Sequence, residues 1–292
     1  MAHVYSVWKE RRDTEAPPMN DSVAQWISRA DVAGRVNNPD RIDVLGVGVH
    51  AVSLKRAVRM IESAIDRDLK GFVCVTGVHG VMEAQGDEKF REVLNSSLLT
   101  TPDGMPMVWV GRLQGHREIR RVFGPELMRV VCSRSVAREY THFLYGGADG
   151  VAEDLSAWMQ GSFPGIRVVG TYTPPFTPLS LEQATELEST IARLKPDIMW
   201  IGLSTPKQER FMAKHIVRLQ TKLMIGVGAA FDYHTGRVQD APAWIKRSGL
   251  QWLHRLAQDP KRLWKRYLVN NPLFLSKIGW QFFRNAGRRG MP

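Results

Sequence analysis

The 292-residue sequence contains only two cysteines, Cys74 and Cys132, and both lie in apolar stretches. Two cysteines cannot supply the disulfide framework of a small secreted domain. They predict instead two buried, reduced thiols, as expected for a cytoplasmic protein. Residues 1–13 are polar and charged and contain no apolar core, so the sequence does not predict a secretory signal.

Long hydrophobic runs and several catalytic motifs are also missing. No run of about 18 apolar residues is present, so no helix is expected to cross a bilayer. We find no P-loop, no G-x-S-x-G string and no cluster with metal-ligand spacing. Gly46-Val47-Gly48 lacks the third glycine of a dinucleotide fingerprint, and the only D-x-D string, Asp66-Arg67-Asp68, ends an amphipathic helix. The sequence therefore predicts no cofactor and no metal site.

Positive charge is present in excess and is concentrated at one end of the chain. The whole sequence has 40 Lys and Arg against 29 Asp and Glu. Residues 1–40 carry five basic and six acidic side chains, residues 41–240 carry 24 and 22, and residues 241–292 carry eleven and one. The last segment also contains many aromatic and large aliphatic residues. Such a segment is expected to meet nucleic-acid phosphate, an anionic membrane surface or a diphosphate ligand.

Short apolar runs alternate with helical patterns of 10–15 residues from Arg41 onward. We predict strands at 42–49, 71–76, 141–145, 166–170, 198–202 and 222–227. We predict helices at 53–68, 80–94, 125–139, 151–160, 181–194 and 206–219. This alternation is typical of the α/β class, with a Rossmann-like parallel sheet core and helices on both faces. From Pro242 only helices are expected, so the domains predicted are a poorly ordered leader (1–40), an α/β core (41–240) and a basic amphipathic helical appendage (241–292).

Polar residues follow several predicted strands, where open α/β sheets bind their ligands. Glycine-rich turns that lead into helices suit a phosphate, because unpaired N–H groups and the helix dipole favour an anion. The candidates are Thr76, His79, Gly146, Gly147, Lys207, Gln208 and Asp232, together with Asp103, which lies in a loop expected at 100–106 before an apolar helix.

Each candidate also has a simpler interpretation. Asp103 could cap a helix that starts near Gly104. His79 could be a turn residue, and Asp232 could cap or bridge a turn. Lys207 and Gln208 could be solvated residues of a first helical turn.

Four strings in a fixed order carry a resemblance to a known family. They are P-D-G (102–104), T-P-K-Q-E (205–209), G-V-G-A-A-F-D (226–232) and G-L-Q-W-L-H-R-L (249–256). With them, the sequence from about Arg41 to Tyr267 closely resembles the WecG/TagA/CpsF glycosyltransferases, glycosyltransferase family 26. It departs from the family at Thr76-Gly77-Val78-His79, which lacks the Asn of T-x-N, and at Glu126, where the family has Asp. The resemblance therefore carries over the reaction and not the donor sugar.

The resemblance implies an inverting, metal-independent glycosyltransferase with a UDP-sugar donor. It would move a hexose, N-acetylhexosamine or hexuronic acid to a polyprenyl-diphosphate-linked saccharide in bacterial exopolysaccharide or cell-surface polysaccharide biosynthesis. The enzyme would be cytoplasmic and peripheral on the inner face of the membrane. Whether it forms a homo-oligomer is left open.

The resemblance also assigns roles to residues. Asp103 would be the catalytic base, with Thr76 in the same pocket, while the role of His79 in this first loop is left open. Side-chain cations of the appendage would neutralise the diphosphate, and the appendage would also hold the enzyme against anionic lipid. The residues expected to bind the UDP donor are Arg121, Gln208, Asp232, Gly146, Gly147, Lys207, Arg255, Arg262, Lys265 and Arg266.

Two other classes of protein remain as alternatives. A nucleic-acid-binding protein would account for the basic charge and not for the loops at the strand ends, so no nucleic acid is expected as a partner. An epimerase-like enzyme that modifies a nucleotide sugar would share the α/β core and the UDP pocket. It would need a bound nicotinamide or a catalytic Tyr/Lys pair, and neither is apparent.

Overall fold

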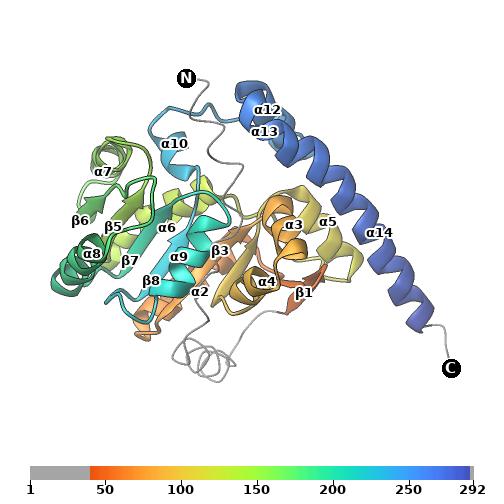
Figure 1. Ribbon diagram of the computed structural model, residues 1–292, viewed down its shortest axis with the longest axis horizontal. Coiled ribbons are helices and arrows are strands. Elements are labelled where there is room, and N and C mark those ends of the chain that lie inside the picture. The colour runs from red at the N-terminus through yellow and green to blue at the C-terminus, as the bar shows by residue number, and fades with distance from the viewer. Residues whose placement is uncertain (1–39, 290–292) are drawn as a thin grey trace.

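The computed structural model describes residues 40–289, so the leader predicted at residues 1–40 lies outside the described residues apart from Asp40. A parallel sheet of six strands forms the centre, in the order β4-β3-β8-β7-β5-β6 (Figure 1). The strands are β3 (Gly71–Thr76), β4 (Leu99–Pro102), β5 (Thr141–Gly146), β6 (Arg167–Tyr172), β7 (Ile198–Gly202) and β8 (Leu223–Gly226). The predicted α/β class and parallel core are confirmed.

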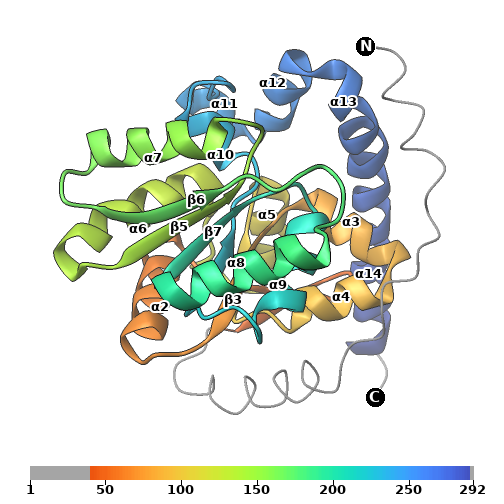
Figure 2. The ribbon, with the colours of Figure 1, turned by 60° about the vertical axis from the view of Figure 1, so that its left-hand side comes forward.

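Helices cover both faces of the sheet. One face carries α3 (Val78–Gly86), α4 (Glu88–Asn95), α8 (Leu181–Leu194) and α9 (Lys207–His215). The other face carries α2 (Leu54–Asp66), α6 (Gly124–Arg138), α7 (Val151–Ser162) and α10 (Ala230–His234). In Figure 2 the helices α8, α9 and α4 lie in front of the sheet. Because both faces are buried, the strands are continuous apolar runs, with Phe72 packing on one side and Val73 on the other.

Two helix starts show how local side chains set the element boundaries. The Ser53 hydroxyl accepts from the Arg56 N–H at 3.4 Å and caps α2. Asp87 accepts from the Phe90 N–H at 2.9 Å and caps α4. This cap divides the helix expected at 80–94 into α3 and α4. Cys74 and Cys132 are buried free thiols, also as predicted.

Two predicted elements were wrong near the N-terminal end of the core. The strand expected at 42–49 is an antiparallel hairpin of β1 (Arg41–Val44) and β2 (Val47–His50), which turns at Leu45 and Gly46 with φ of 54° and 84°. Residues 100–106 were expected as a loop, whereas Leu99–Pro102 forms strand β4, paired with β3. Threonine and proline in this order are typical of a loop. The segment is nevertheless a strand, because it is buried and pairs with β3. Asp103 consequently follows directly on a strand end.

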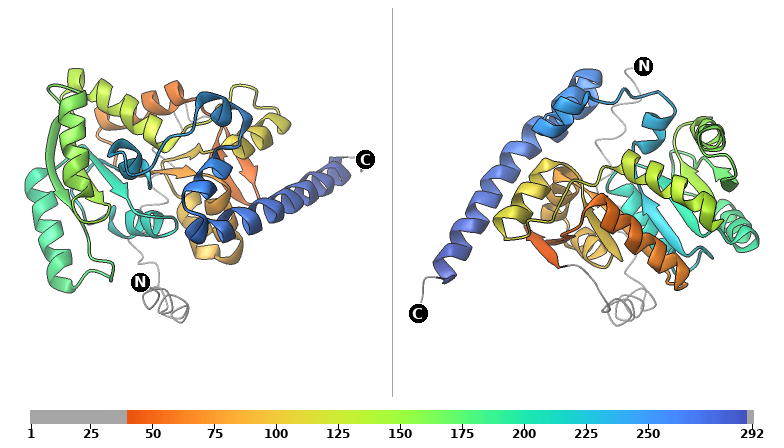
Figure 3. Two further views of the ribbon diagram at one scale, coloured as in Figure 1. Left: turned by 90° about the horizontal axis from the view of Figure 1, so that it is seen from above. Right: turned by 180° about the vertical axis from the view of Figure 1, so that it is seen from behind.

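The last part of the chain is helical throughout, as predicted. It comprises α11 (Ala243–Ser248), α12 (Gln251–Gln258), α13 (Pro260–Trp264), a π-helical segment η1 (Lys265–Val269) and α14 (Asn270–Arg289). Helix α14 runs along the side of the core beside α3 and α5 (Met105–Leu113), as Figures 1 and 3 show from opposite sides. Its Phe274 and Ile278 are buried in the core. Within residues 40–289, no helix is long and apolar enough to cross a membrane.

Candidate active site

The ends of β3 and β4 bring the two predicted catalytic residues together. Thr76 pairs with Pro102 across the two strands, and the Asp103 N–H donates to the Thr76 carbonyl at 2.9 Å. A Cβ on Gly77 would lie 2.9 Å from the Asp103 carbonyl oxygen, so only glycine allows this approach. The site lies at the carboxyl ends of β3 and β4, and β8 pairs with β3 on its other side. This is the usual place for a ligand in an open α/β sheet.

The carboxylate of Asp103 does not cap the following helix. Helix α5 begins at Met105, its N-cap residue is Gly104, and no side chain makes the capping hydrogen bond. The capping interpretation of Asp103 was therefore wrong. Burial raises the pKa of Asp103, while the positive charges of Arg121, Arg266 and Arg255 oppose that rise. The Asp103 carboxylate thus lies near three arginines and is not used to cap a helix.

The arginines reach Asp103 from two parts of the chain. Arg121 precedes α6, lies 5.0 Å from the centre of the Phe123 ring and donates to the Gln251 amide oxygen of α12. Arg255, also on α12, lies 5.2 Å from the centre of the Tyr233 ring on α10. The core and the appendage (residues 241–292) are therefore joined directly beside Asp103.

Arg266 lies in η1 and is half-buried. Burial lowers its pKa, and the like charges of Arg255 and Arg262 act in the same direction, while Asp103 opposes them. Among the described residues, its buried Nε has no hydrogen-bond partner. π-Helical segments occur frequently at functional sites. Cations that are close together and incompletely neutralised favour an anionic ligand between them.

Gln208 joins two of the strand-end loops. It is 3% exposed, its amide oxygen accepts from the Gly228 N–H at 3.0 Å, and its amide nitrogen donates to Glu209 at 2.9 Å. The solvated interpretation of Gln208 was therefore wrong. Its predicted contact with the donor stays a prediction.

Glu209 is a buried carboxylate to which sequence reasoning assigned no role. Its Oε1 accepts from the Thr205 hydroxyl and from the Gln208 amide, each at 2.9 Å. Burial raises its pKa, and the nearby charge of Arg266 opposes the rise. Its Oε2 is buried and has no partner among the described residues, as is also true of the Thr76 and Thr101 hydroxyls.

The glycines after β5 are explained by close packing. Gly146 has φ of 121°, and a Cβ there would lie 2.7 Å from the carbonyl of Gly202. Gly147 has φ of 83°, and a Cβ there would lie 2.7 Å from Val151. Their predicted role in binding the donor phosphates stays a prediction.

His79 lies at the start of α3 and faces the appendage. Burial and the charge of Arg266 lower its pKa to about 4, so the ring is neutral at pH 7. Its Nδ1 lies 3.4 Å from the Asn270 amide nitrogen of α14 and 3.6 Å from a Glu83 carboxylate oxygen. The residue connects α3 to α14 and is more than a turn histidine.

Four other predicted donor ligands lie nearer the surface. Lys207 is exposed on the first turn of α9, and Asp232 is half-buried on α10. The Lys265 ammonium lies 5.4 Å from the centre of the Trp264 ring, and Arg262 pairs with Asp259 at 2.6 Å. Their roles stay predictions.

Comparison with known proteins identifies the family. Residues 42–288 match the glycosyl transferase WecG/TagA/CpsF family. The chain belongs to this family. It is a glycosyltransferase, and the resemblance drawn from the four sequence strings is confirmed.

Two relatives of this glycosyltransferase share one described activity. A protein of Bacillus subtilis (strain 168) is 28% identical over 204 residues, covering 70% of this chain and 77% of its own length. A protein of Staphylococcus aureus (strain MRSA252) is 24% identical over 244 residues, covering 83% of this chain and 93% of its own length. Both are named N-acetylglucosaminyldiphosphoundecaprenol N-acetyl-β-D-mannosaminyltransferase.

Residues that sequence reasoning missed share one feature in this glycosyltransferase. Glu209 and Gln251 lie inside two of the four strings that carried the resemblance. Glu209 directly follows Gln208, and Gln251 directly precedes Trp252. Tyr233 follows Asp232 directly, and burial raises the pKa of its hydroxyl to about 12. Position within or directly next to the four strings was thus the available indication. Within the part of the chain that the structure describes, no group of three or more His, Cys, Asp or Glu is arranged to hold a metal.

Proposed function

We propose that this glycosyltransferase moves a sugar from a UDP-sugar, with inversion, onto a polyprenyl-diphosphate-linked saccharide. The names of the relatives support this acceptor class, because both describe transfer to a sugar on a diphosphoundecaprenol carrier. The donor sugar is a hexose, an N-acetylhexosamine or a hexuronic acid. The product would serve cell-surface polysaccharide synthesis.

In the proposed reaction, Asp103 is the general base. Its carboxylate takes the proton of the acceptor hydroxyl as that oxygen attacks the anomeric carbon of the donor. The bond from this carbon to the UDP oxygen breaks on the opposite face, which inverts the configuration. The raised pKa of Asp103 favours this role, because a base is most effective when its pKa lies nearer the working pH.

The leaving UDP requires positive charge, and the arginines supply it. Arg121, Arg255 and Arg266 all act on the Asp103 carboxylate, and two of them come from the appendage. This convergence of arginines from two regions on one core carboxylate is the observation that carries the proposal. Because side-chain cations can stabilise the developing diphosphate charge, we propose that transfer needs no metal ion.

We further propose that the enzyme works on the inner face of the cytoplasmic membrane. The appendage carries eleven basic side chains and one acidic one. It exposes large apolar side chains, including Trp264, Leu268 and Leu273. Basic side chains interleaved with exposed apolar ones are typical of a helix that lies at an anionic lipid surface.

A donor screen tests the proposal. The purified enzyme is incubated with individual UDP-sugars and a synthetic prenyl-diphosphate N-acetylglucosamine, and both UDP release and product mass are measured. We expect one donor to give a product of acceptor plus sugar, with inverted configuration by NMR, and an unchanged rate in EDTA. A UDP-sugar altered without acceptor would indicate the epimerase-like alternative. Activity lost in EDTA and restored by Mn²⁺ would overturn metal independence.

A further inference from the structure

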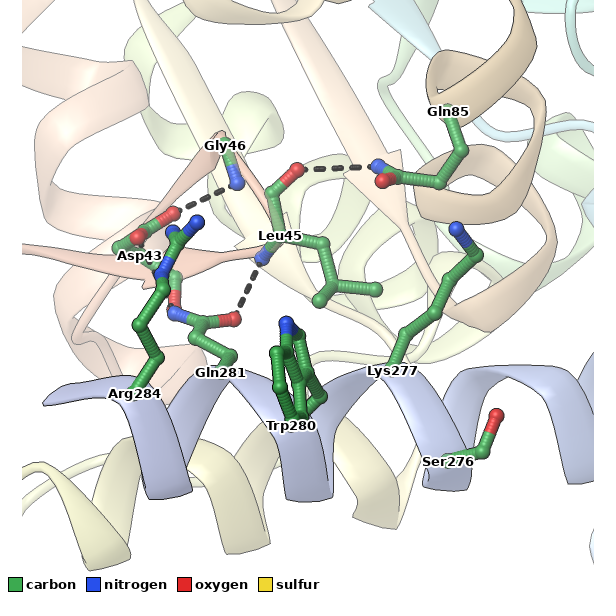
Figure 4. Close-up of a pocket in the computed structure, with 9 residues that line it drawn as sticks. All are labelled: Asp43, Leu45, Gly46, Gln85, Ser276, Lys277, Trp280, Gln281 and Arg284. Atoms are coloured by element: carbon green, nitrogen blue, oxygen red, sulfur yellow. Dashed lines mark hydrogen bonds between the residues drawn. The ribbon is translucent and has the colours of Figure 1, made fainter. Parts of the chain in front are cut away.

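A cavity lies far along α14 from Asp103. It has a volume of about 550 Å³ and opens between the turn of the β1–β2 hairpin, the end of α3 and the outer half of α14 (Figure 4). No residue assigned to the reaction lines it. Trp280 lies fourteen positions after Arg266, which corresponds to about 21 Å along a helix. The cavity is therefore separate from the site that would hold the donor diphosphate.

The inner wall of this cavity is held by hydrogen bonds between α14 and the hairpin. The Gln281 amide oxygen accepts from the Leu45 N–H at 3.0 Å, and its amide nitrogen donates to an Asp43 carboxylate oxygen at 3.0 Å. The other oxygen of that carboxylate accepts from the Gly46 N–H at 2.7 Å. Asp43 is thus occupied with the turn, and the wall is preformed.

The outer wall presents unpaired cations beside an exposed indole. Lys277 and Arg284 lie on either side of Trp280, with Lys277 extending toward Gln85 and Arg284 toward Asp43 (Figure 4). Both cations are exposed, and neither makes an ion pair with another described residue. With Asp43, the lining carries two positive charges and one negative charge. The cavity therefore favours an anion.

The surroundings of the cavity indicate that this anion belongs to a lipid. Leu273, Lys277, Trp280 and Arg284 are spaced i, i+4, i+7 and i+11, so they form one stripe along α14 in which apolar and basic side chains alternate. Leu273 is 46% exposed and Trp280 is 64% exposed, and the ring of Phe283 stacks beside Trp280 at 5.7 Å. A soluble phosphate would leave this apolar surface in water. A lipid would cover it.

We propose that this cavity binds the headgroup of an anionic phospholipid. Lys277 and Arg284 contact the headgroup phosphate from the two ends of the cavity, and Trp280 lies at the level of the glycerol. Leu273 and Phe283 enter the acyl boundary. This inference rests on the membrane location proposed above, and it adds a defined site that fixes α14 against the bilayer.

Vesicle binding tests the proposal on the full-length protein. Sedimentation is measured with phosphatidylcholine vesicles, with and without phosphatidylglycerol, for Lys277→Gln/Arg284→Gln and for Trp280→Ala. The control Lys55→Gln/Lys89→Gln removes the same charge from exposed positions of α2 and α4. We expect the cavity pair and Trp280→Ala each to weaken binding to phosphatidylglycerol vesicles at least about tenfold, and the control to change it less than about twofold. Transfer to a water-soluble acceptor should be unchanged in all variants.

Two results would overturn the proposal. Equal losses in the cavity pair and its control would mean that only net charge matters. A crosslink between Lys277 and a residue before Asp40 in the free protein would make the chain's own N-terminal segment the occupant. The readouts are independent of the proposed reaction, because vesicle binding can be measured whether or not any UDP-sugar is transferred. Failure of the donor screen would therefore leave this test intact.

Discussion

The core and the appendage contribute to the candidate active site in different ways. The core fixes Asp103 through backbone contacts, since its N–H bonds to Thr76 and its carbonyl packs against Gly77. The appendage contributes Arg255 and Arg266 from short helical segments on which few side chains are buried. The sheet thus positions the Asp103 carboxylate, and the appendage supplies positive charge near it.

The same contrast appears in the distribution of charge. Residues 41–240 are almost balanced, with 24 basic and 22 acidic side chains, whereas residues 241–292 have eleven and one. The like charges of Arg255 and Arg262 repel the charge of Arg266. The Asp103 carboxylate offsets part of this repulsion, and an anionic ligand would offset more. The candidate site therefore combines residues of both regions.

Removing the carboxylate of the core should have the largest effect. Asp103→Asn should lower kcat by about 10²–10⁴, the usual contribution of acid–base catalysis, with little change in the Kd for UDP. Steady-state transfer and calorimetric UDP binding measure the two quantities. Asp149→Asn, at an exposed loop position, is the matched control and should leave both unchanged. Near wild-type turnover in Asp103→Asn would exclude Asp103 as the base.

Removing a cation of the appendage should have the next largest effect. Arg266→Gln should lower kcat by about 10²–10³, because a preorganised charge that faces the leaving group is lost. Lys261→Gln, exposed on the neighbouring helix α13, should leave transfer unchanged. Initial rates at saturating donor separate the two variants. If both variants lost activity equally, the appendage would act through its net charge rather than through Arg266.

A core contact of α14 tests whether the appendage is also part of the fold. Ile278→Ala should lower the free energy of unfolding by about 2–3 kcal/mol, because the residue is 7% exposed and packs among core side chains. Leu275→Ala, three residues earlier and 63% exposed, should change it by less than about 0.5 kcal/mol. Urea denaturation measures both. Equal stabilities would show that α14 docks without stabilising the core.

The smallest expected effect is on the pH profile. Arg121 lowers the pKa of Asp103, so Arg121→Gln should let that pKa rise further. A base with a higher pKa is protonated earlier as the pH falls, so the acid limb of kcat/KM should move to higher pH. Arg112→Gln, exposed on α5, should leave the limb in place. A shift toward lower pH in Arg121→Gln would contradict this electrostatic arrangement.

The sequence by itself determined the elements of the core and the distribution of charge. The strands at 71–76 and 198–202 and the helix at 181–194 have the predicted bounds, because each is a strong local pattern. The strings at the strand ends also located Thr76 and Asp103. Local pattern failed at Leu99–Pro102, where burial against β3 overrides a loop-like composition.

Only the tertiary structure decided which remote residues meet. The periodicity of apolar residues indicates which side of a segment is buried. It does not indicate which strand lies beside which in the sheet. In the sheet, β3 lies beside β8. Arg121 of the core donates to Gln251 of the appendage across 130 positions of the chain. These contacts bring the arginines of the appendage to Asp103. The same packing buries Glu209. It also brings Arg266 close enough to Asp103 for their charges to interact, while the adjacent Lys265 lies over the Trp264 ring. Adjacent residues of a helical segment point in different directions, so the packing of η1 determines which of these two neighbouring cations faces Asp103.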